Sequence, residues 1–265
     1  MPTLKSETVL KARLGNFIPP SPTSAYTVGI ARDFEEVRSA QQLRFQVFNV
    51  ELGEGLDASI SSGHDSDKFD AVCDHLLIRA ANTGEVVGTY RLQTGSNARG
   101  NLGYYSEQEF EFGPFEAIRD RTIELGRACI AKEHRNMVVL GLLWKGIAQY
   151  AKLYGARYLI GCSSYTSTNP AVGLAAYHSL SRYQAEEAFL TRPKAGFECE
   201  VVHREEIQQV DPKDAKAPRL MRAYLTLGAR LCGKPALDRE FKTIDFLTLL
   251  DLERLGPRAI RKFLG

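Results

Sequence analysis

The sequence has no long apolar run, and this absence argues against a helical membrane span. A transmembrane helix needs roughly 18 or more consecutive apolar residues, and the apolar stretch at 138–144 is far shorter. The N-terminal residues carry Lys5, Glu7, Lys11 and Arg13 in place of the apolar segment of a secretory signal. We therefore expect a cytoplasmic protein without a secretory leader.

Cysteines are few, and the common catalytic motifs are missing. The five cysteines are Cys73, Cys129, Cys162, Cys199 and Cys232. Their odd number, wide spacing and lack of a CxxC pair predict reduced thiols, with neither a disulfide framework nor a zinc site. There is also no GxSxG, HExxH or EF-hand pattern, so nucleophilic hydrolase chemistry and the common metal sites have no support.

Charge is balanced over the whole chain but uneven along it. The 265 residues include 34 Lys and Arg against 32 Asp and Glu, a net charge of +2. With 25% charged and 44% hydrophobic residues, the composition is that of a globular protein and excludes a disordered, collagen-like or coiled-coil chain. Residues 212–265, however, hold 12 basic and 6 acidic side chains. This basic C-terminal quarter predicts an acidic partner or an anionic membrane surface, or is simply a solvated face. Nucleic acid is not expected, because no ribonucleoprotein motif or recognition helix is present.

The pattern of apolar residues predicts an α/β (α+β) core at 26–185, in which a mixed sheet is flanked by helices. The expected strands are 26–31, 75–80, 86–92, 121–131 and 157–162, and the expected helices begin at 34, 139 and 170. Asp33 is a suitable N-cap, and Asn82 and Gly84 are hairpin-turn residues. Residues 1–25 are predicted to be flexible. Residues 186–265 are predicted to be a helical, basic extension packed on the core, with a strand pair near 197–209 and helices near 216–232 and 243–263.

One expected strand carries two opposite charges. Glu124 and Arg127 stand three residues apart, and a regular strand directs such positions to opposite faces unless a bulge intervenes. Gly126, between them, is well suited to a bulge. Buried charge is costly unless it is paired or functional. The pair therefore indicates either a structural ion pair at the sheet edge or a reactive site.

Two further segments offer groups that bind ligands. The basic segment 131–137 directly precedes a predicted helix, and a helix N-terminus beside positive charge suits a phosphate; the alternative is an ordinary exposed loop. Residues 65–75 contain four aspartates and His75, a set that suits a cationic amine better than a metal, because no metal-ligand spacing is present. By its position at the start of an apolar strand, His75 is more typical of a structural histidine.

Several motifs together resemble the GCN5-related N-acyltransferases and, more narrowly, the hemolysin-like ornithine lipid synthases. They are Phe69-Asp-x-x-Cys-Asp-His-Leu76, Gly88-Thr-Tyr-Arg-Leu92, Arg121–Ile130 with the loop through Arg135, and tail motifs within 218–246. A more distant similarity, to acyl-homoserine-lactone synthases, rests on Leu43-Arg-x-x-Val-Phe48, Asp67, Asp70, Arg91, Glu124 and Arg127. The resemblance spans residues 26–263.

The resemblance implies a site between two splayed parallel strands, here 121–131 and 157–162, which admit the pantetheine arm of acyl carrier protein. It implies Glu124 as general base, with Arg127 as its orienting partner. The implied substrate-binding residues are Arg44, Asp67, Asp70, His75 and Arg91. The implied acyl-donor residues are Ile130, Arg135, Asn136, Val139, Leu140 and Gly141. No metal or cofactor is implied beyond the acyl thioester.

The expected function is transfer of a 3-hydroxyacyl chain from acyl carrier protein to the α-amine of ornithine, giving lyso-ornithine lipid. The alternatives are acylation of glycine or another amino acid, synthesis of an acyl-homoserine lactone, and a non-catalytic membrane-active protein. The basic tail, with Arg258, Arg261 and Lys262, is expected to contact the acidic carrier or the anionic inner membrane, which would place the protein peripherally on that membrane.

Overall fold

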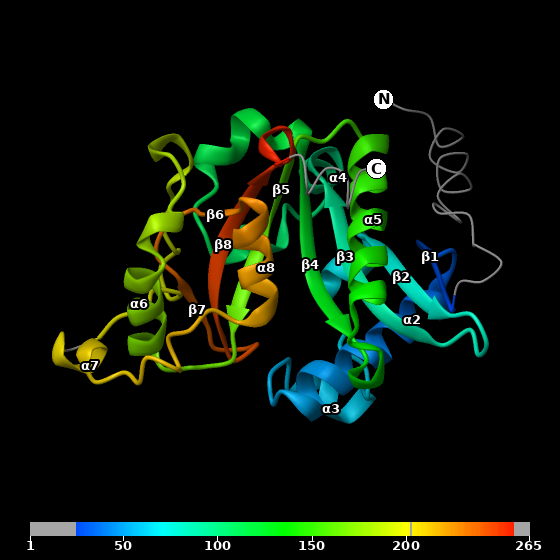
Figure 1. Cartoon of the computed structure of the whole chain (residues 1–265), viewed down its shortest axis with the longest axis horizontal. Coiled ribbons are helices and arrows are strands. Elements are labelled where there is room, and N and C mark those ends of the chain that lie inside the picture. The colour runs from blue at the N-terminus through cyan, green and yellow to red at the C-terminus, as the bar shows by residue number, and fades with distance from the viewer. Residues whose placement is uncertain (1–24, 202, 257–265) are drawn as a thin grey trace.

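The computed structural model describes residues 25–201 and 203–256, and in this part of the chain helices flank one mixed eight-stranded sheet (Figure 1). The strands are β1 (Tyr26–Ile30), β2 (Asp74–Ala80), β3 (Val86–Thr94), β4 (Thr122–Ile130), β5 (Tyr158–Tyr165), β6 (Arg230–Leu231), β7 (Ala236–Asp238) and β8 (Thr243–Asp251). The helices are α2 (Phe34–Phe45), α3 (Ala58–Ser62), α4 (Gly95–Gly100), α5 (Met137–Leu153), α6 (Pro170–Ser179), α7 (Glu205–Gln208) and α8 (Arg219–Leu227). The prediction made for residues 1–25 lies almost wholly outside the described residues.

The elements predicted for the core occur in the predicted order from β1 to α6, and the structure adds two short helices, α3 and α4, that were not predicted. Asp33 accepts a hydrogen bond from the amide of Glu36 and begins α2, and Asn169 caps α6 in the same way. β2 and β3 are antiparallel and are joined through Gly84, whose φ of 75° favours glycine. Local turn and capping chemistry therefore places the core elements along the chain.

Helices cover both faces of the sheet. On one face, Trp144 and Ile147 of α5 pack with Leu76 and Tyr90 of the sheet. On the opposite face, α2 packs against β2, β3 and β4. Figure 1 shows α8 on the same face as α5, in front of β5 and β8, while α6 lies at the far edge. The strand order is β1-β2-β3-β4-β5-β8-β6, and β7 also pairs with β8.

The helix predicted at 243–263 is wrong over its described part. Thr243–Asp251 forms β8, which pairs antiparallel with β5 along its length and with β6 and β7 on its other side. Nearly all of β8 is buried, so its apolar run lacks the two-residue alternation that marks a half-exposed strand. The C-terminal region thus contributes strands to the sheet.

The other C-terminal predictions have mixed outcomes. The strand pair expected near 197–209 is wrong, because the described residues there contain α7 and a single bridge between Glu198 and Ala236. The helix expected near 216–232 is confirmed over the span of α8. The boundary at residue 186 stays a prediction.

The central strands β4 and β5 separate soon after they meet. They are parallel and pair only over Thr122–Glu124 and Tyr158–Ile160, after which β5 continues beside β8 alone. They diverge where Gly161 passes the carbonyl oxygen of Leu125: a Cβ atom at position 161 would lie 2.2 Å from that oxygen. The predicted splay of these two strands is confirmed.

No helix among the described residues is long and apolar enough to cross a membrane.

Candidate active site

A cavity of about 340 Å³ lies where β4 and β5 separate. Polar residues line it on the α2 face of the sheet: Arg91, Tyr105, Glu124, Arg127 and Asp245. Apolar and aromatic residues line it on the face covered by α5 and α8: Tyr90, Trp144, Met221 and Tyr224. The volume of the cavity is typical of a small-molecule site. The cavity has a polar part and an apolar part, which meet at the gap between the two strands.

A bulge in β4 directs Glu124 and Arg127 to the same face. Between two aligned pairs of β3 and β4, β4 contains one residue more than β3. The sequence allowed for a bulge at Gly126, but Arg127 rather than Gly126 takes the left-handed conformation, with φ of 50°. This backbone conformation costs roughly 1–2 kcal/mol for a residue with a side chain, and the ion pairs of Arg127 oppose that cost.

Glu124 is buried and held by the 3-10 turn Tyr105–Gln108. Its carboxylate accepts hydrogen bonds from the backbone N–H of Tyr105 (2.6 Å) and from the N–H (2.9 Å) and hydroxyl of Ser106. Burial raises the pKa of Glu124, these hydrogen bonds lower it, and the net shift is upward. Among the described residues no hydrogen bond or ion pair joins Glu124 to Arg127, so the turn, and not the expected arginine, orients this carboxylate.

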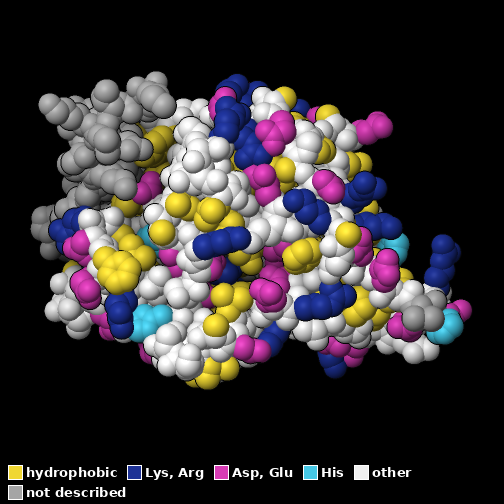
Figure 2. Space-filling view, turned by 180° about the vertical axis from the view of Figure 1, so that it is seen from behind, with side chains coloured by type: hydrophobic (Ala, Val, Ile, Leu, Met, Phe, Trp, Pro, Cys, Tyr) yellow, Lys and Arg dark blue, Asp and Glu magenta, His cyan; other side chains and the backbone are white. Residues whose placement is uncertain are grey.

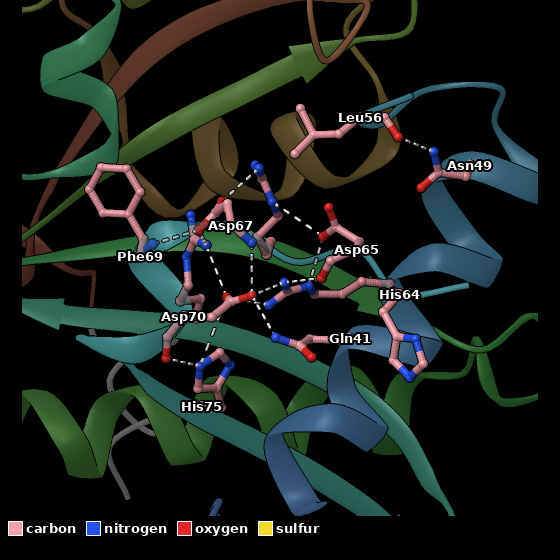
Figure 3. A network of polar contacts seen from close by, with 12 residues as sticks. Gln41, Asn49, Leu56, His64, Asp65, Asp67, Phe69, Asp70 and His75 are labelled. Carbon is pink, nitrogen blue, oxygen red and sulfur yellow. Dashed lines mark hydrogen bonds and ion pairs between the residues drawn. The ribbon is translucent and has the colours of Figure 1, made fainter. Parts of the chain in front are cut away.

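Buried ion pairs lie beside the cavity, between α2 and the sheet (Figure 3). The fully buried side chain of Arg44 donates to Asp65 (2.8 Å) and Asp70 (2.7 Å). Arg91 donates to Asp67 (2.6 Å) and Asp70 (3.1 Å). Burial raises the pKa of Asp70, but the charge and hydrogen bonds of Arg44 dominate and hold it far below its usual range. Arg44 and Arg91 therefore brace the acids.

Arg127 connects these ion pairs to the cavity. It pairs with Asp67 (3.0 Å) and Asp65 (3.4 Å), and its guanidinium lies 4.2 Å from the centre of the Phe241 ring. Asp67 and Asp70, which were expected to hold a cationic amino acid, thus already have arginine partners, and neither lines the cavity. The geometry gives that expectation no support.

His75 also lies outside the cavity lining. Its Nε2 is 3.1 Å from the carbonyl oxygen of Asp70, and its imidazole is buried. Burial lowers the pKa of His75 to about 4. The histidine is therefore neutral at pH 7 and packs as part of the structure.

We expect the neutral state of His75 to make stability depend on pH. The imidazole of His75 takes up a proton near pH 6.5 in the unfolded chain but only near pH 4 in the folded chain. The stabilisation that comes from the neutral imidazole is therefore complete above pH 6.5 and is lost as the pH falls from 6.5 to 4. A shift of this size corresponds to roughly 3 kcal/mol. In urea unfolding, the free energy of unfolding of His75→Asn should differ less between pH 7 and pH 5 than that of the wild type. The exposed control His178→Asn should show the same difference as the wild type. Equal pH dependence in all three proteins would contradict this assignment.

The residues expected to bind the acyl donor gather at the N-terminus of α5. They are Ile130, Arg135, Asn136, Val139, Leu140 and Gly141. Asn136 caps the helix by accepting from two first-turn amides, at 3.0 Å each. Arg135 donates to the carbonyl oxygen of Ile130 (3.0 Å) and pairs with Glu51. None of these residues lines the cavity.

The sequence analysis missed two parts of the site. Tyr105 and Ser106, which hold Glu124, belong to an irregular polar segment that gives no local signal. Glu109 and Asp245 form a second group of buried acids. Asp245 did offer a signal, because it is a charged residue inside the apolar run of β8, yet that run was interpreted as a helix.

Known proteins resemble this chain in sequence, and others resemble it in fold. Residues 43–145 match the family described as "Acetyltransferase (GNAT) domain". The L-ornithine N(alpha)-acyltransferase of Brucella abortus (strain 2308) is 30% identical, over 98% of this chain and 96% of that protein. The same-named protein of Agrobacterium fabrum (strain C58 / ATCC 33970) is 32% identical, over 89% and 84%. The crystal structure of the AHL synthase LasI has the same fold, with a TM-score of 0.50 and 16% identity over 91% of this chain and 94% of that chain.

The fold and the matched domain define an acyltransferase of the GNAT type. The chain belongs to the L-ornithine N(alpha)-acyltransferase family, since similarity at this level extends over nearly its whole length.

Proposed function

We propose that this protein transfers a 3-hydroxyacyl chain from acyl carrier protein to the α-amine of ornithine and so forms lyso-ornithine lipid. The observation that carries the proposal is the cavity between β4 and β5, whose polar wall holds the buried Glu124. The names of the relatives support ornithine as the acceptor. The acyl thioester is the only co-substrate, and no metal or other cofactor takes part.

The acyl donor enters from the face covered by α5 and α8. The aromatic and apolar lining there, including Trp144 and Tyr224, suits an acyl chain. Beyond Glu124, β4 no longer pairs with β5, and a backbone N–H on this free edge polarises the thioester carbonyl. The phosphate of the pantetheine arm lies near the N-terminus of α5.

Ornithine enters from the polar face. Arg91 and Arg127 line this face and are held in place by their ion pairs with Asp67. The α-nitrogen attacks the thioester carbon, a C–N bond forms, the C–S bond breaks, and the carrier leaves as a free thiol after taking up a proton. Glu124 accepts the proton that the α-amine loses, directly or through one water.

Carrier docking and membrane contact are assigned to the basic C-terminal region. Arg258, Arg261 and Lys262 lie outside the described residues. On the face seen in Figure 2, basic and acidic side chains of the described part alternate, and no broad field of one sign is visible among them. We therefore assign the contact with an acidic carrier to the C-terminal charge and not to this face.

We expect Ser106→Ala to shift the pH profile of the reaction. The Ser106 hydroxyl donates to the ionised form of Glu124 and lowers its pKa, so its loss raises that pKa. The base is then ionised only at higher pH, and the acid limb of kcat/KM moves toward alkaline pH by about one unit. The exposed Ser61→Ala serves as control. An unmoved limb with a uniformly lower rate would mean that Ser106 only supports the fold.

Expression in a host that lacks aminolipids tests the proposed function. The expected result is a new lipid that contains ornithine and one 3-hydroxyacyl chain, detected by mass spectrometry of lipid extracts. The Glu124→Gln variant, present at equal abundance, should give much less of it. A new lipid with another amino acid would show that this amino acid, and not ornithine, is the acceptor. An unchanged lipid profile, despite folded protein and available acyl carrier, would overturn the proposal.

A further inference from the structure

A second acidic group lies at one end of the cavity. The side chains of Glu109 and Asp245 are 1% and 3% exposed, and with the Cys162 thiol they place one ligand atom each within 4.8 Å of one another. Oε1 of Glu109 and Oδ1 of Asp245 have no hydrogen-bond partner. Both Asp245 and Cys162 line the cavity. Asp245 also interacts with Glu109, Ser164 and Thr243. A donor from outside the chain would satisfy the one oxygen of each carboxyl group that has no partner.

The groups around this pair are mostly acidic. Asp238 and Glu54 add negative charge to the field at Asp245 and Glu109. Arg127 is the cation that acts on Glu109, and its charge is already matched by Asp65 and Asp67. Burial and the neighbouring acids raise the pKa of Asp245 to about 6 and that of Glu109 well above its usual range. An incoming cation would allow both carboxyl groups to ionise.

Building on the proposed function, we propose that Glu109 and Asp245 bind the δ-ammonium group of ornithine and so select diamino acids as acceptors. Asp67 and Asp70 are not available for this role, because arginines already neutralise them. Among the described residues, no ion pair joins Glu109 or Asp245 to a lysine or arginine; Asp245 lines the cavity, and Glu109 lies close to it. Glu54 also lines the cavity, where it accepts a hydrogen bond from the Thr166 hydroxyl. Two ionised oxygens facing one ammonium form the strong, charge-assisted type of hydrogen bond.

A metal ion is the competing occupant, since two carboxylates and a thiol are possible ligands. Burial and the surrounding acids raise the pKa of the Cys162 thiol well above its usual range, so a metal would have to displace a tightly held proton to bind there. The thiolate is the form that binds metals. The Cys162 thiol instead lies 3.8 Å from Glu109 as a donor.

The test compares ornithine with norvaline, which has the same carbon chain but no δ-amine. In the wild type, kcat/KM should be much higher for ornithine. Asp245→Asn and Glu109→Gln should lower kcat/KM for ornithine by about 10- to 100-fold, and should lower it far less for norvaline, so the preference collapses. The exposed control Asp214→Asn should keep the wild-type preference. Equal losses for both amino acids, or an undiminished ornithine preference in folded variants, would overturn the inference.

Two further measurements separate this inference from the proposed function. Calorimetric titration with ornithine alone should show binding that Asp245→Asn weakens and that norvaline does not reproduce, whether or not acyl transfer is detected. If the wild type binds ornithine in this way but transfers no acyl chain, the proposed function fails and the inference stands. Elemental analysis of the purified protein should find no stoichiometric metal, and a metal that is present in the wild type and lost in Asp245→Asn would overturn the inference.

Discussion

Replacing Glu124 by Gln is expected to lower kcat by about 10²- to 10⁴-fold, the contribution typical of a general base. The buried carboxyl group lines the cavity and has a raised pKa, so it can take the proton of an attacking amine near neutral pH. Gln keeps the size of the side chain and removes its basicity. Steady-state assays with saturating acyl donor and ornithine measure the loss.

The same substitution needs a control for folding. The two oxygens of Glu124 accept hydrogen bonds from the backbone amides of Tyr105 and Ser106. In Glu124→Gln the side-chain NH₂ group replaces one of these oxygens and points its own N–H donors at a backbone N–H. Circular dichroism and thermal unfolding must therefore show a folded variant, and the exposed Glu205→Gln should retain full activity. A folded Glu124→Gln enzyme with a kcat within about tenfold of the wild type would remove Glu124 from the role of base.

Replacing Asp70 by Asn is expected to lower the free energy of unfolding by about 3–5 kcal/mol, because it breaks a buried ion pair from one side. The guanidinium of Arg44 has no exposed surface and would keep its charge without one of its two carboxylate partners. Arg91 would also lose its second carboxylate. Urea unfolding at pH 7 measures the change through the shift in midpoint.

An exposed ion pair supplies the matched control. Asp211→Asn removes a carboxylate that pairs with Lys213 at the surface, where such pairs contribute about 0–1 kcal/mol. If Asp70→Asn cost no more than Asp211→Asn, the buried ion pairs would not be needed to hold Arg44 and Arg91 in place.

The core of the fold was predictable from sequence because its elements carry local signals. Asp33 and Asn169 begin helices, Gly84 turns a hairpin, and the apolar face of α5 repeats at helical spacing. β8 carries no such signal. Ile244, Leu247 and Leu250 repeat at three-residue spacing, which suits a helix, and burial of both faces hides the strand period. Pairing with β5, which is 79 to 93 residues away in the sequence, decides its conformation.

The site was predictable in part. The charges of Glu124 and Arg127 inside a strand, together with Gly126, allowed for a bulge, and a bulge is present. Which groups meet across the fold was not predictable. Arg127 pairs with Asp67 across 60 residues, and the amides that hold Glu124 belong to a turn with no distinctive composition. Partner choice between buried charges depends on packing, which composition and spacing do not encode.

Reconstitution with purified components tests the central claim most directly. The protein is incubated with 3-hydroxyacyl carrier protein and ornithine, and the products are analysed by tandem mass spectrometry. The account predicts an amide on the α-nitrogen of ornithine, one free carrier thiol per amide formed, and a large loss of both in Glu124→Gln. Acylation on the δ-nitrogen, or no amide from folded protein and intact acyl carrier, would contradict it.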